Sequence, residues 1–109
     1  MSIRNQIRKG STELVLLSLL QERPMYGYEI SQEMARLSGG YFEMKEGLLY
    51  PTLHRLKKEG LLSSQWQQAE NDRRRQYYTI TAAGRERLQE QSSEWQTFMQ
   101  KLQEIINSV

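Results

Sequence analysis

Cysteine is missing from this chain of 109 residues, and histidine occurs once, as His54. Without thiols the chain can form neither a disulfide framework nor a thiolate metal site. A single histidine excludes a His-rich metal site, and it excludes a Ser-His-Asp triad with a base to spare. The sequence also has no Gly-rich phosphate loop and no nucleophile paired with a base. We therefore expect a protein that is not an enzyme and that carries no metal or other cofactor.

Long apolar runs are also missing. The most apolar stretch, Leu14 to Leu20, has seven residues and contains Ser18, whereas a helix needs about 20 apolar residues to cross a bilayer. The N-terminus carries Arg4, Arg8 and Lys9 but no apolar segment before a cleavage site, so it is not a secretory signal. Together with the missing cysteines, these features predict a cytoplasmic protein with no membrane partner.

Phe and Trp are few, with two of each, and 38% of the chain is hydrophobic. A chain of this length can enclose one small core but not two ordinary domains. We expect one domain with at most an appendage, and association with another chain would bury further apolar surface.

Positive charge is gathered in three short clusters. The net charge is only +2, but residues 1–62 hold 9 Lys and Arg against 7 acids, while residues 81–109 hold 3 against 4. The clusters lie at residues 4–9, 55–58 and 73–75. A fold that aligned them on one surface would suit nucleic acid.

The stretch from Glu46 to Leu62 predicts a short amphipathic helix. Its apolar stripe follows the i, i+4, i+7 spacing and consists of Leu49, Leu53 and Leu56. Its opposite half is polar and carries His54, Arg55 and Lys58. Such a helix suits insertion into a DNA major groove, although most helices of this kind only expose a charged face to water. The helix alone leaves both alternatives open.

Proline and glycine define the limits of this helix. Pro51 has no N–H and clashes with the carbonyl four residues before it, so we expect Gly47 to be non-helical and the helix to start at about Leu48. At the other end, Gly60 fits a left-handed position and Leu61 can contact the last apolar turn, as in a Schellman stop.

A β-hairpin is expected after this helix. Ser63–Gln68 and Arg74–Ile80 have strand character, and Asn71 lies in the turn between them. Three arginines on or beside the returning strand are placed to follow phosphates or to enter a minor groove: Arg73, Arg74 and Arg75. The alternative is that these charges only keep a solvated strand edge from pairing.

Residues 1–24 predict one central helix. Ile3 and Ile7 suggest a short arm or helix before Gly10, with a solvated tail as the alternative. Ser11 or Thr12 can then cap an apolar helix that ends before residue 24, a proline.

Residues 26–45 predict a second helix and a short strand. The apolar stripe of the helix consists of Ile30, Met34 and Leu37. Two glycines at positions 39 and 40 break it, and residues 41–45 alternate like a strand, with Phe42 and Met44 facing inward.

These helices followed by a hairpin with an arginine-rich tip are the plan of a winged helix-turn-helix. We expect a mainly α fold with a small β-hairpin and a long C-terminal helix. Residues 1–80 would form the DNA-binding domain, and residues 81–109 would form the dimerisation helix.

The C-terminal helix carries an apolar seam. Thr81 can cap it, and no proline follows. The seam has a 3-4 repeat and consists of Leu88, Trp95, Phe98, Met99, Leu102, Ile105, Ile106 and Val109. It either packs back on its own domain or pairs with the same helix of a second chain. Pairing is favoured because a two-fold dimer presents two DNA-reading helices to a palindromic site.

Four motifs span nearly the whole chain. They are Gly10-Ser11-Thr12-Glu13-Leu14, Tyr26-Gly27-Tyr28-Glu29-Ile30, Gly47-Leu48-Leu49-Tyr50-Pro51-Thr52-Leu53 with Leu56 and Glu59-Gly60-Leu61, and the run from Arg75 to Gly84. Together they resemble the PadR family of bacterial winged-helix transcriptional regulators, in its short form with one C-terminal helix.

The resemblance implies a dimeric repressor that binds double-stranded DNA at a palindromic operator. The helix with Tyr50 and Pro51 would enter the major groove. Tyr50 would reach DNA with its hydroxyl, or it would simply pack at the helix start. For His54 the alternatives are a contact to the groove or a phosphate and an inert surface imidazole.

Trp95 lies on the seam near a polar gap at Gln91 and Ser92. Two-fold symmetry can bring it together with its mate, and two facing indoles can leave a flat slot. The resemblance implies a planar aromatic small-molecule effector in such a slot, as in drug-responsive members of the family. The alternative is an ordinary core tryptophan.

The competing function is a winged helix that binds protein and never touches DNA. Salt dependence separates the two functions, because phosphate contacts weaken steeply with salt and apolar contacts do not.

Overall fold

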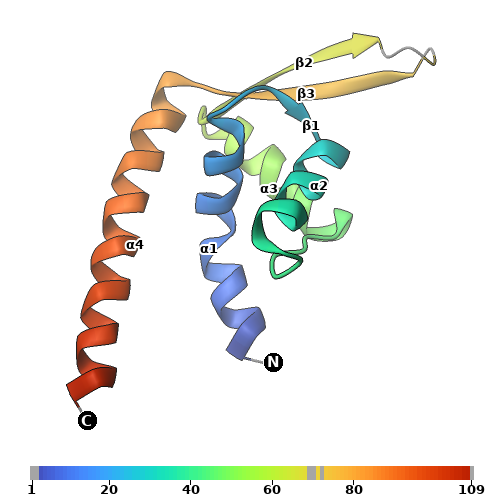
Figure 1. The fold of residues 1–109 in the computed structure, drawn as a ribbon. Helices are drawn as coiled ribbons and strands as arrows, with labels where there is room; N and C mark the ends of the chain where they lie inside the picture. Colours follow the sequence, from blue (N-terminus) through green and yellow to red (C-terminus); the bar gives the residue numbers. More distant parts are fainter. Residues whose placement is uncertain (1–2, 69–70, 72, 109) are drawn as a thin grey trace.

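A computed structural model of the chain describes residues 3–68, 71 and 73–108. Within these residues the protein forms four helices and one three-stranded sheet (Figure 1). In chain order the elements are α1 (Ile3–Leu20), β1 (Met25–Tyr26), α2 (Gly27–Ser38), α3 (Glu46–Lys58), β2 (Leu62–Gln68), β3 (Arg74–Ile80) and α4 (Ala82–Ser108). The strand order is β1-β3-β2, and both pairs are antiparallel. The expected fold, a winged helix-turn-helix with a long C-terminal helix, is confirmed.

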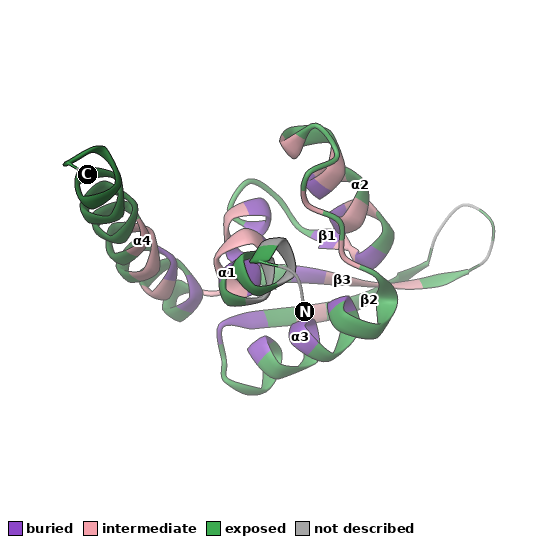
Figure 2. Cartoon of the chain, turned by 90° about the horizontal axis from the view of Figure 1, so that it is seen from below, coloured by how far each residue is buried: buried purple, intermediate pink, exposed green. Residues whose placement is uncertain are grey.

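The core lies where α1, α2 and α3 meet the sheet. Figure 2 shows buried positions on each of these elements. The apolar residues of this core are Leu16, Leu17, Leu19, Leu20, Met25, Ile30, Met34, Leu49, Leu53, Leu56, Leu61, Leu62, Tyr78, Ile80 and Leu88. Their burial confirms the stripe of α3 predicted from the leucine spacing, because all three of those leucines are enclosed. The small set of large apolar residues therefore makes one core, as the composition predicted.

α1 passes through Gly10 without a break, so the expected boundary there is wrong. Ser11 is not a cap, because its hydroxyl donates back to the carbonyl of Ile7 at 3.2 Å, inside the helix. Thr12 is likewise internal. A glycine inside a helix costs only about 1 kcal/mol, and the buried leucines of the following turns offset that cost.

Residues 41–45 form a loop and not the expected strand, although Phe42 and Met44 do pack on the core. The third strand is β1, whose Tyr26 pairs with Tyr77 of β3. A strand of two residues is too short to show alternation in the sequence. The apolar stripe of α2 is also shorter than expected, because Leu37 is exposed at the end of the helix.

The start of α4 is fixed against the turn that follows α3. The Thr81 hydroxyl accepts from the Gly84 N–H at 3.0 Å and donates to the Gly60 carbonyl at 2.7 Å. The Thr81 N–H donates to the Leu61 carbonyl at 3.1 Å. The predicted N-cap is thus confirmed, and it also joins α4 to the end of α3.

Beyond its first turns, α4 leaves the core. Figure 1 shows it beside α1 and then running on to the C-terminus, in a molecule with a longest extent of 59 Å. Large apolar side chains on its second half are exposed: Phe98, Met99, Leu102, Ile105 and Ile106. Among the described residues, no helix combines the length and apolar character that a membrane crossing requires.

Gly84 has no room for a side chain, which the sequence did not reveal. A Cβ there would collide with the Leu61 carbonyl oxygen and lie 2.7 Å from Cγ1 of Ile80. We predict that Gly84→Ala lowers the free energy of unfolding by about 1–3 kcal/mol, as other overpacked sites do. Urea denaturation would measure this loss.

Gly10→Ala is the matched control, because a Cβ at Gly10 meets nothing within 4 Å. There we expect a gain of about 0.5–1 kcal/mol from higher helix propensity. Equal effects of the two substitutions would show that the contact with Leu61 is not a constraint.

Candidate nucleic-acid interface

α3 begins at Glu46, two residues before the predicted start, and Pro51 lies inside it. The N–H groups of Leu48 and Leu49 donate to the Lys45 carbonyl at 3.0 and 2.9 Å and so form the first turn. The expectation that Gly47 is non-helical is therefore wrong. Pro51 removes only one bond, and the Gly47 carbonyl that loses it belongs to an exposed residue that water can reach.

The end of α3 is the predicted Schellman stop. Gly60 has φ 81°. Its N–H donates to the Lys57 carbonyl at 3.0 Å, and the Leu61 N–H donates to the Leu56 carbonyl at 2.9 Å. Leu56 and Leu61 are both buried, as the motif requires.

The outward crest of α3 carries Pro51, His54 and Lys58. At 3.6 residues per turn these positions lie opposite the buried leucine stripe, and all three residues are exposed. Arg55 and Tyr50 lie on the two flanks of the helix instead. The crest thus faces solvent on the side of α3 opposite the core.

Arg55 is engaged within the protein. Its Nη1 lies 3.2 Å from Oε1 of Glu13 on α1 and 2.8 Å from Oε2 of Glu59. The side chain of Arg55 remains half exposed. A phosphate would therefore have to compete with two carboxylates for this guanidinium.

Tyr50 packs against the start of α2. A Cβ at Gly27 would lie 2.6 Å from the Tyr50 hydroxyl oxygen, so glycine is needed there for the close approach of the ring. The pKa of Tyr78 is raised by burial and, to a smaller extent, by the neighbouring Tyr50. The ring thus packs at the helix start while the side chain stays partly open to solvent, and the predicted contact of Tyr50 with DNA stays a prediction.

The hairpin has the predicted strands, with β2 one residue longer at its start, and Gln68 lies opposite Arg74. In the turn, Oδ1 of Asn71 accepts from the Arg73 N–H at 3.4 Å, as Asn does in tight turns. The rest of the predicted tip, residues 69, 70 and 72, lies outside the described residues.

The hairpin arginines differ in their surroundings. Arg75 lies over the ring of Tyr26, with its Cζ 4.4 Å from the ring centroid, and Arg74 lies 5.4 Å from the ring centroid of Trp66. Because strand residues alternate, these two guanidinium groups lie on opposite faces of the hairpin. Arg73 is exposed at the turn. Arg75 is held by its own domain, whereas Arg73 projects toward the solvent.

Two further residues of α3 are exposed but were not among the predicted DNA contacts. They are Leu48 in the first turn and Lys57 in the last. The first basic cluster cannot be added to this surface, because the side chains of Arg4, Arg8 and Lys9 lie outside the described part of the chain.

The predicted seam of α4 divides into two parts. Leu88 is buried in the core of its own chain and leaves little surface for a partner. The exposed part starts near Trp95, which is half-buried, and continues through the apolar side chains given above. Val109 lies outside the described residues.

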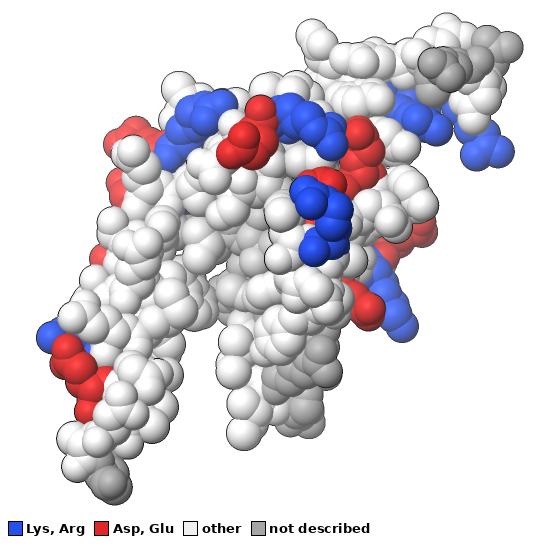
Figure 3. All heavy atoms as spheres, in the orientation of Figure 1, with Lys and Arg blue, Asp and Glu red and all other residues white. Residues whose placement is uncertain are grey.

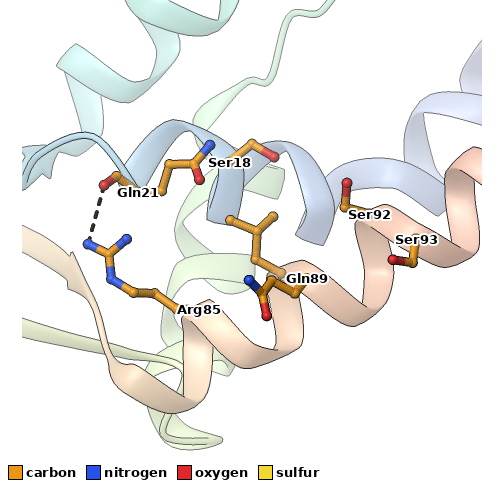
Figure 4. Close-up of a pocket in the computed structure, with 7 residues that line it drawn as sticks. Ser18, Gln21, Arg85, Gln89, Ser92 and Ser93 are labelled. Carbon is orange, nitrogen blue, oxygen red and sulfur yellow. Dashed lines mark hydrogen bonds between the residues drawn. The ribbon is translucent and has the colours of Figure 1, made fainter.

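The residues expected around a ligand slot are separated within one chain. Trp95 lines an apolar hollow of about 530 Å³ between α4, α1 and α2. Ser92 lines a different, polar hollow, where Arg85 donates to the Gln21 carbonyl at 3.3 Å (Figure 4). Gln91 donates to Glu13. Only Trp95 of the three is thus placed at an apolar site.

The charges are unevenly distributed over the face shown in Figure 3. Charged atoms gather over the upper part of the molecule, near the hairpin and along the outer flank of α4, whereas the described atoms between α4 and α1 are mostly uncharged. The side chains that line the apolar hollow are themselves uncharged.

The arrangement of a solvated basic helix, a hairpin and a long terminal helix recurs in known proteins. The model of the transcriptional regulator PadR-like family matches residues 16–90. The chain belongs to this PadR-like family. The transcriptional regulator Rv3488 of Mycobacterium tuberculosis is 36% identical over 85 residues, which are 78% of this chain and 76% of that protein.

Solved structures of PadR-like regulators have the same fold. A transcriptional regulator from Clostridium thermocellum has a TM-score of 0.83 and 31% identity, over 91% of this chain and 96% of that one. A PadR family regulator from Eggerthella lenta has a TM-score of 0.82 and 29% identity, over 93% and 86% of the two chains. The protein is therefore a DNA-binding transcription regulator and not an enzyme.

The different surroundings of Lys58 and Arg75 lead to different expected roles in this PadR-like protein. We predict that Lys58→Ala weakens binding to double-stranded DNA and lowers the salt slope by about 1, the effect of losing one phosphate contact. Fluorescence anisotropy over a range of salt concentrations would measure it.

Arg75→Ala removes the same charge and serves as the control. Since its guanidinium stacks on Tyr26, we expect an unchanged slope and a loss of about 0.5–1 kcal/mol in stability. A lower salt slope for Arg75→Ala, together with an unchanged salt slope for Lys58→Ala, would reverse these assignments.

Proposed function

We propose that this PadR-like regulator is a dimeric repressor that acts in the cytoplasm and binds a palindromic operator. The helix α3 of each protomer would read the major groove, and its hairpin would contact phosphates or the minor groove. A planar aromatic small molecule would release it. The proposal rests on one observation: the chain exposes a polar crest on α3 and also an apolar face on α4.

The dimer is supported by the second half of α4. Phe98 is 56% exposed and Ile105 is 64% exposed, and their neighbours on the same face are apolar too. Contiguous apolar surface of this kind is unfavourable in water and marks an interaction site. A second copy of the helix offers the same face, so a two-fold interface would be self-complementary.

DNA contact is supported by the crest and the turn. Pro51, His54 and Lys58 face outward, and Arg73 projects from the hairpin. In a two-fold dimer these groups occur twice, at a spacing that the α4 pair would fix. We assign the crest to base edges and nearby phosphates, and the turn to the phosphate backbone.

The effector site is supported by Trp95 alone. Its ring lies edge-on to Phe98, with 5.7 Å between centroids and an interplanar angle of 78°. It also lines the apolar hollow. A planar aromatic ligand between Trp95 and its two-fold mate would gain stacking energy and could spread the paired helices. Gln91 and Ser92 would not form the slot in the arrangement of a single chain.

Leu102→Asp tests the dimer and its link to DNA binding. A charge on the apolar face would be buried without a partner in a dimer, so we predict monomers in sedimentation and loss of operator binding. The winged domain should stay folded by circular dichroism. DNase footprinting on the DNA upstream of the protein's own gene would supply the operator.

A Leu102→Asp variant that stays dimeric would place the interface elsewhere. Parent protein whose binding to this DNA is insensitive to salt, or absent, would favour a winged helix that binds protein.

Trp95→Phe tests the effector site by fluorescence. We predict that a planar aromatic cation quenches the parent protein and that the quenching is largely lost in Trp95→Phe, where Trp66 remains as the internal reference. The expected loss follows from the position of Trp95 in the apolar hollow. Quenching that persists undiminished in the variant, or that no planar compound produces, would remove Trp95 from the effector site.

A further inference from the structure

Glu13 of α1 joins three helices through one carboxylate. Its Oε1 lies 3.2 Å from Nη1 of Arg55 on α3, and its Oε2 lies 3.2 Å from Nη1 of Arg87 on α4. Nε2 of Gln91, also on α4, donates to the same Oε2. The Glu13 side chain is only 14% exposed, so these three groups replace most of its water.

A carboxylate removed from water needs its charge compensated. Glu13 has two arginines for this purpose, and they come from helices with different proposed tasks. Arg55 belongs to the helix that faces DNA, and Arg87 belongs to the helix that carries the apolar seam. The compensation of one charge is thus shared between α3 and α4.

Gln91 indicates that the α4 side of this cluster is held by Glu13. The Gln91 amide donates to the carboxylate, while its Oε1 is buried without a hydrogen-bond partner. It is the one such side-chain atom in the described part of the chain. A buried acceptor without a donor is unfavourable. We infer that the bond from Nε2 to Glu13 offsets this cost and fixes the orientation of the amide.

Arg55 is the group through which this cluster can affect DNA. Its guanidinium is half exposed and also lies 2.8 Å from Glu59. A DNA phosphate can recruit Arg55 only by competing with the carboxylates. The strength of the Glu13 contact therefore determines how easily the guanidinium can turn to a phosphate.

We propose that Glu13 is a positioning residue that links the placement of α4 to the DNA affinity of α3. With Arg87 and Gln91 in place, the carboxylate is well compensated and Arg55 is readily shared with DNA. When α4 moves away, Arg55 becomes the one cation that the described side chains leave on Glu13, and it is held back from DNA. This proposal rests on the proposed DNA contact by α3, and it assigns to Glu13 the regulation of that contact.

The first test is Glu13→Gln, which keeps the side-chain shape and removes the charge. Using the footprinted operator and a random-sequence duplex, we expect binding tighter by about 1.5-fold to fivefold, the range of an exposed charge pair. The salt slope should rise by up to about 1, because Arg55 then meets a phosphate without sharing its charge with Glu13. Both changes should disappear in the Arg55→Ala background.

The charge-matched control is Glu104→Gln. It also removes one acid and frees one cation, Lys101 at 3.5 Å, on the outer half of α4. We expect it to leave the slope unchanged. A rise in slope equal to that of Glu13→Gln would show that net charge alone is responsible and would overturn the proposal.

The second test is Arg87→Ala, which removes a half-exposed side chain and leaves the nearly buried Glu13 unchanged. We expect DNA binding weaker by a similar factor, because Glu13 would then hold Arg55 alone. The loss should vanish in both the Glu13→Gln and the Arg55→Ala backgrounds.

A loss that persists in the Arg55→Ala background would overturn the proposal, since Arg87 would then act on DNA by another route. Weaker binding by Glu13→Gln at an unchanged slope would show a merely structural role. Parent protein that binds neither duplex would instead refute the DNA contact itself. That outcome differs from a parent protein that binds DNA but in which the effects of the single substitutions simply add.

Discussion

The architecture depends on the contact between the end of α3 and the start of α4. Thr81 binds the two carbonyls of Gly60 and Leu61, and Gly84 lets the backbones meet with no Cβ between them. Gly60 and Leu61 therefore end α3, lead into the hairpin and, through Thr81, hold the start of α4. Since α4 can leave the core only along the direction set there, the positions of α3, the hairpin and α4 are fixed together.

This arrangement gives the sides of α3 different tasks. Tyr50 on one flank is fitted to α2, and Arg55 on the other is paired with α1. The crest between them remains open and carries a single lysine, Lys58. A basic stretch of sequence is thus divided by the fold into groups that hold the domain together and groups that face the solvent. The same division separates Arg75, stacked on Tyr26, from Arg73.

Sequence reasoning succeeded where local chemistry decides the outcome. The leucine spacing of α3, its stop at Gly60 and the cap at Thr81 follow from side chains within a few residues of one another. It failed at Gly10, where burial of the following turns outweighs the poor helix propensity of glycine. It also missed the pairing of Arg55 with Glu13, which lies 42 positions away along the chain. Such pairings depend on how helices are placed in space, and periodicity carries no information about them.

The seat of α4 at Gly84 also makes the helix a lever with its pivot at one end. At 1.5 Å per residue, Gln91 lies about 10 Å from the pivot, Trp95 about 16 Å and Ile106 about 33 Å. A rigid tilt that moves the outer end by a given amount moves Gln91 by about one third of it and Trp95 by about half. Displacements at the exposed end thus reach the carboxylate of Glu13 reduced in amplitude. A hydrogen bond tolerates only a few tenths of an ångström before it weakens, so a shift of about one ångström at the far end is already on the scale that matters there.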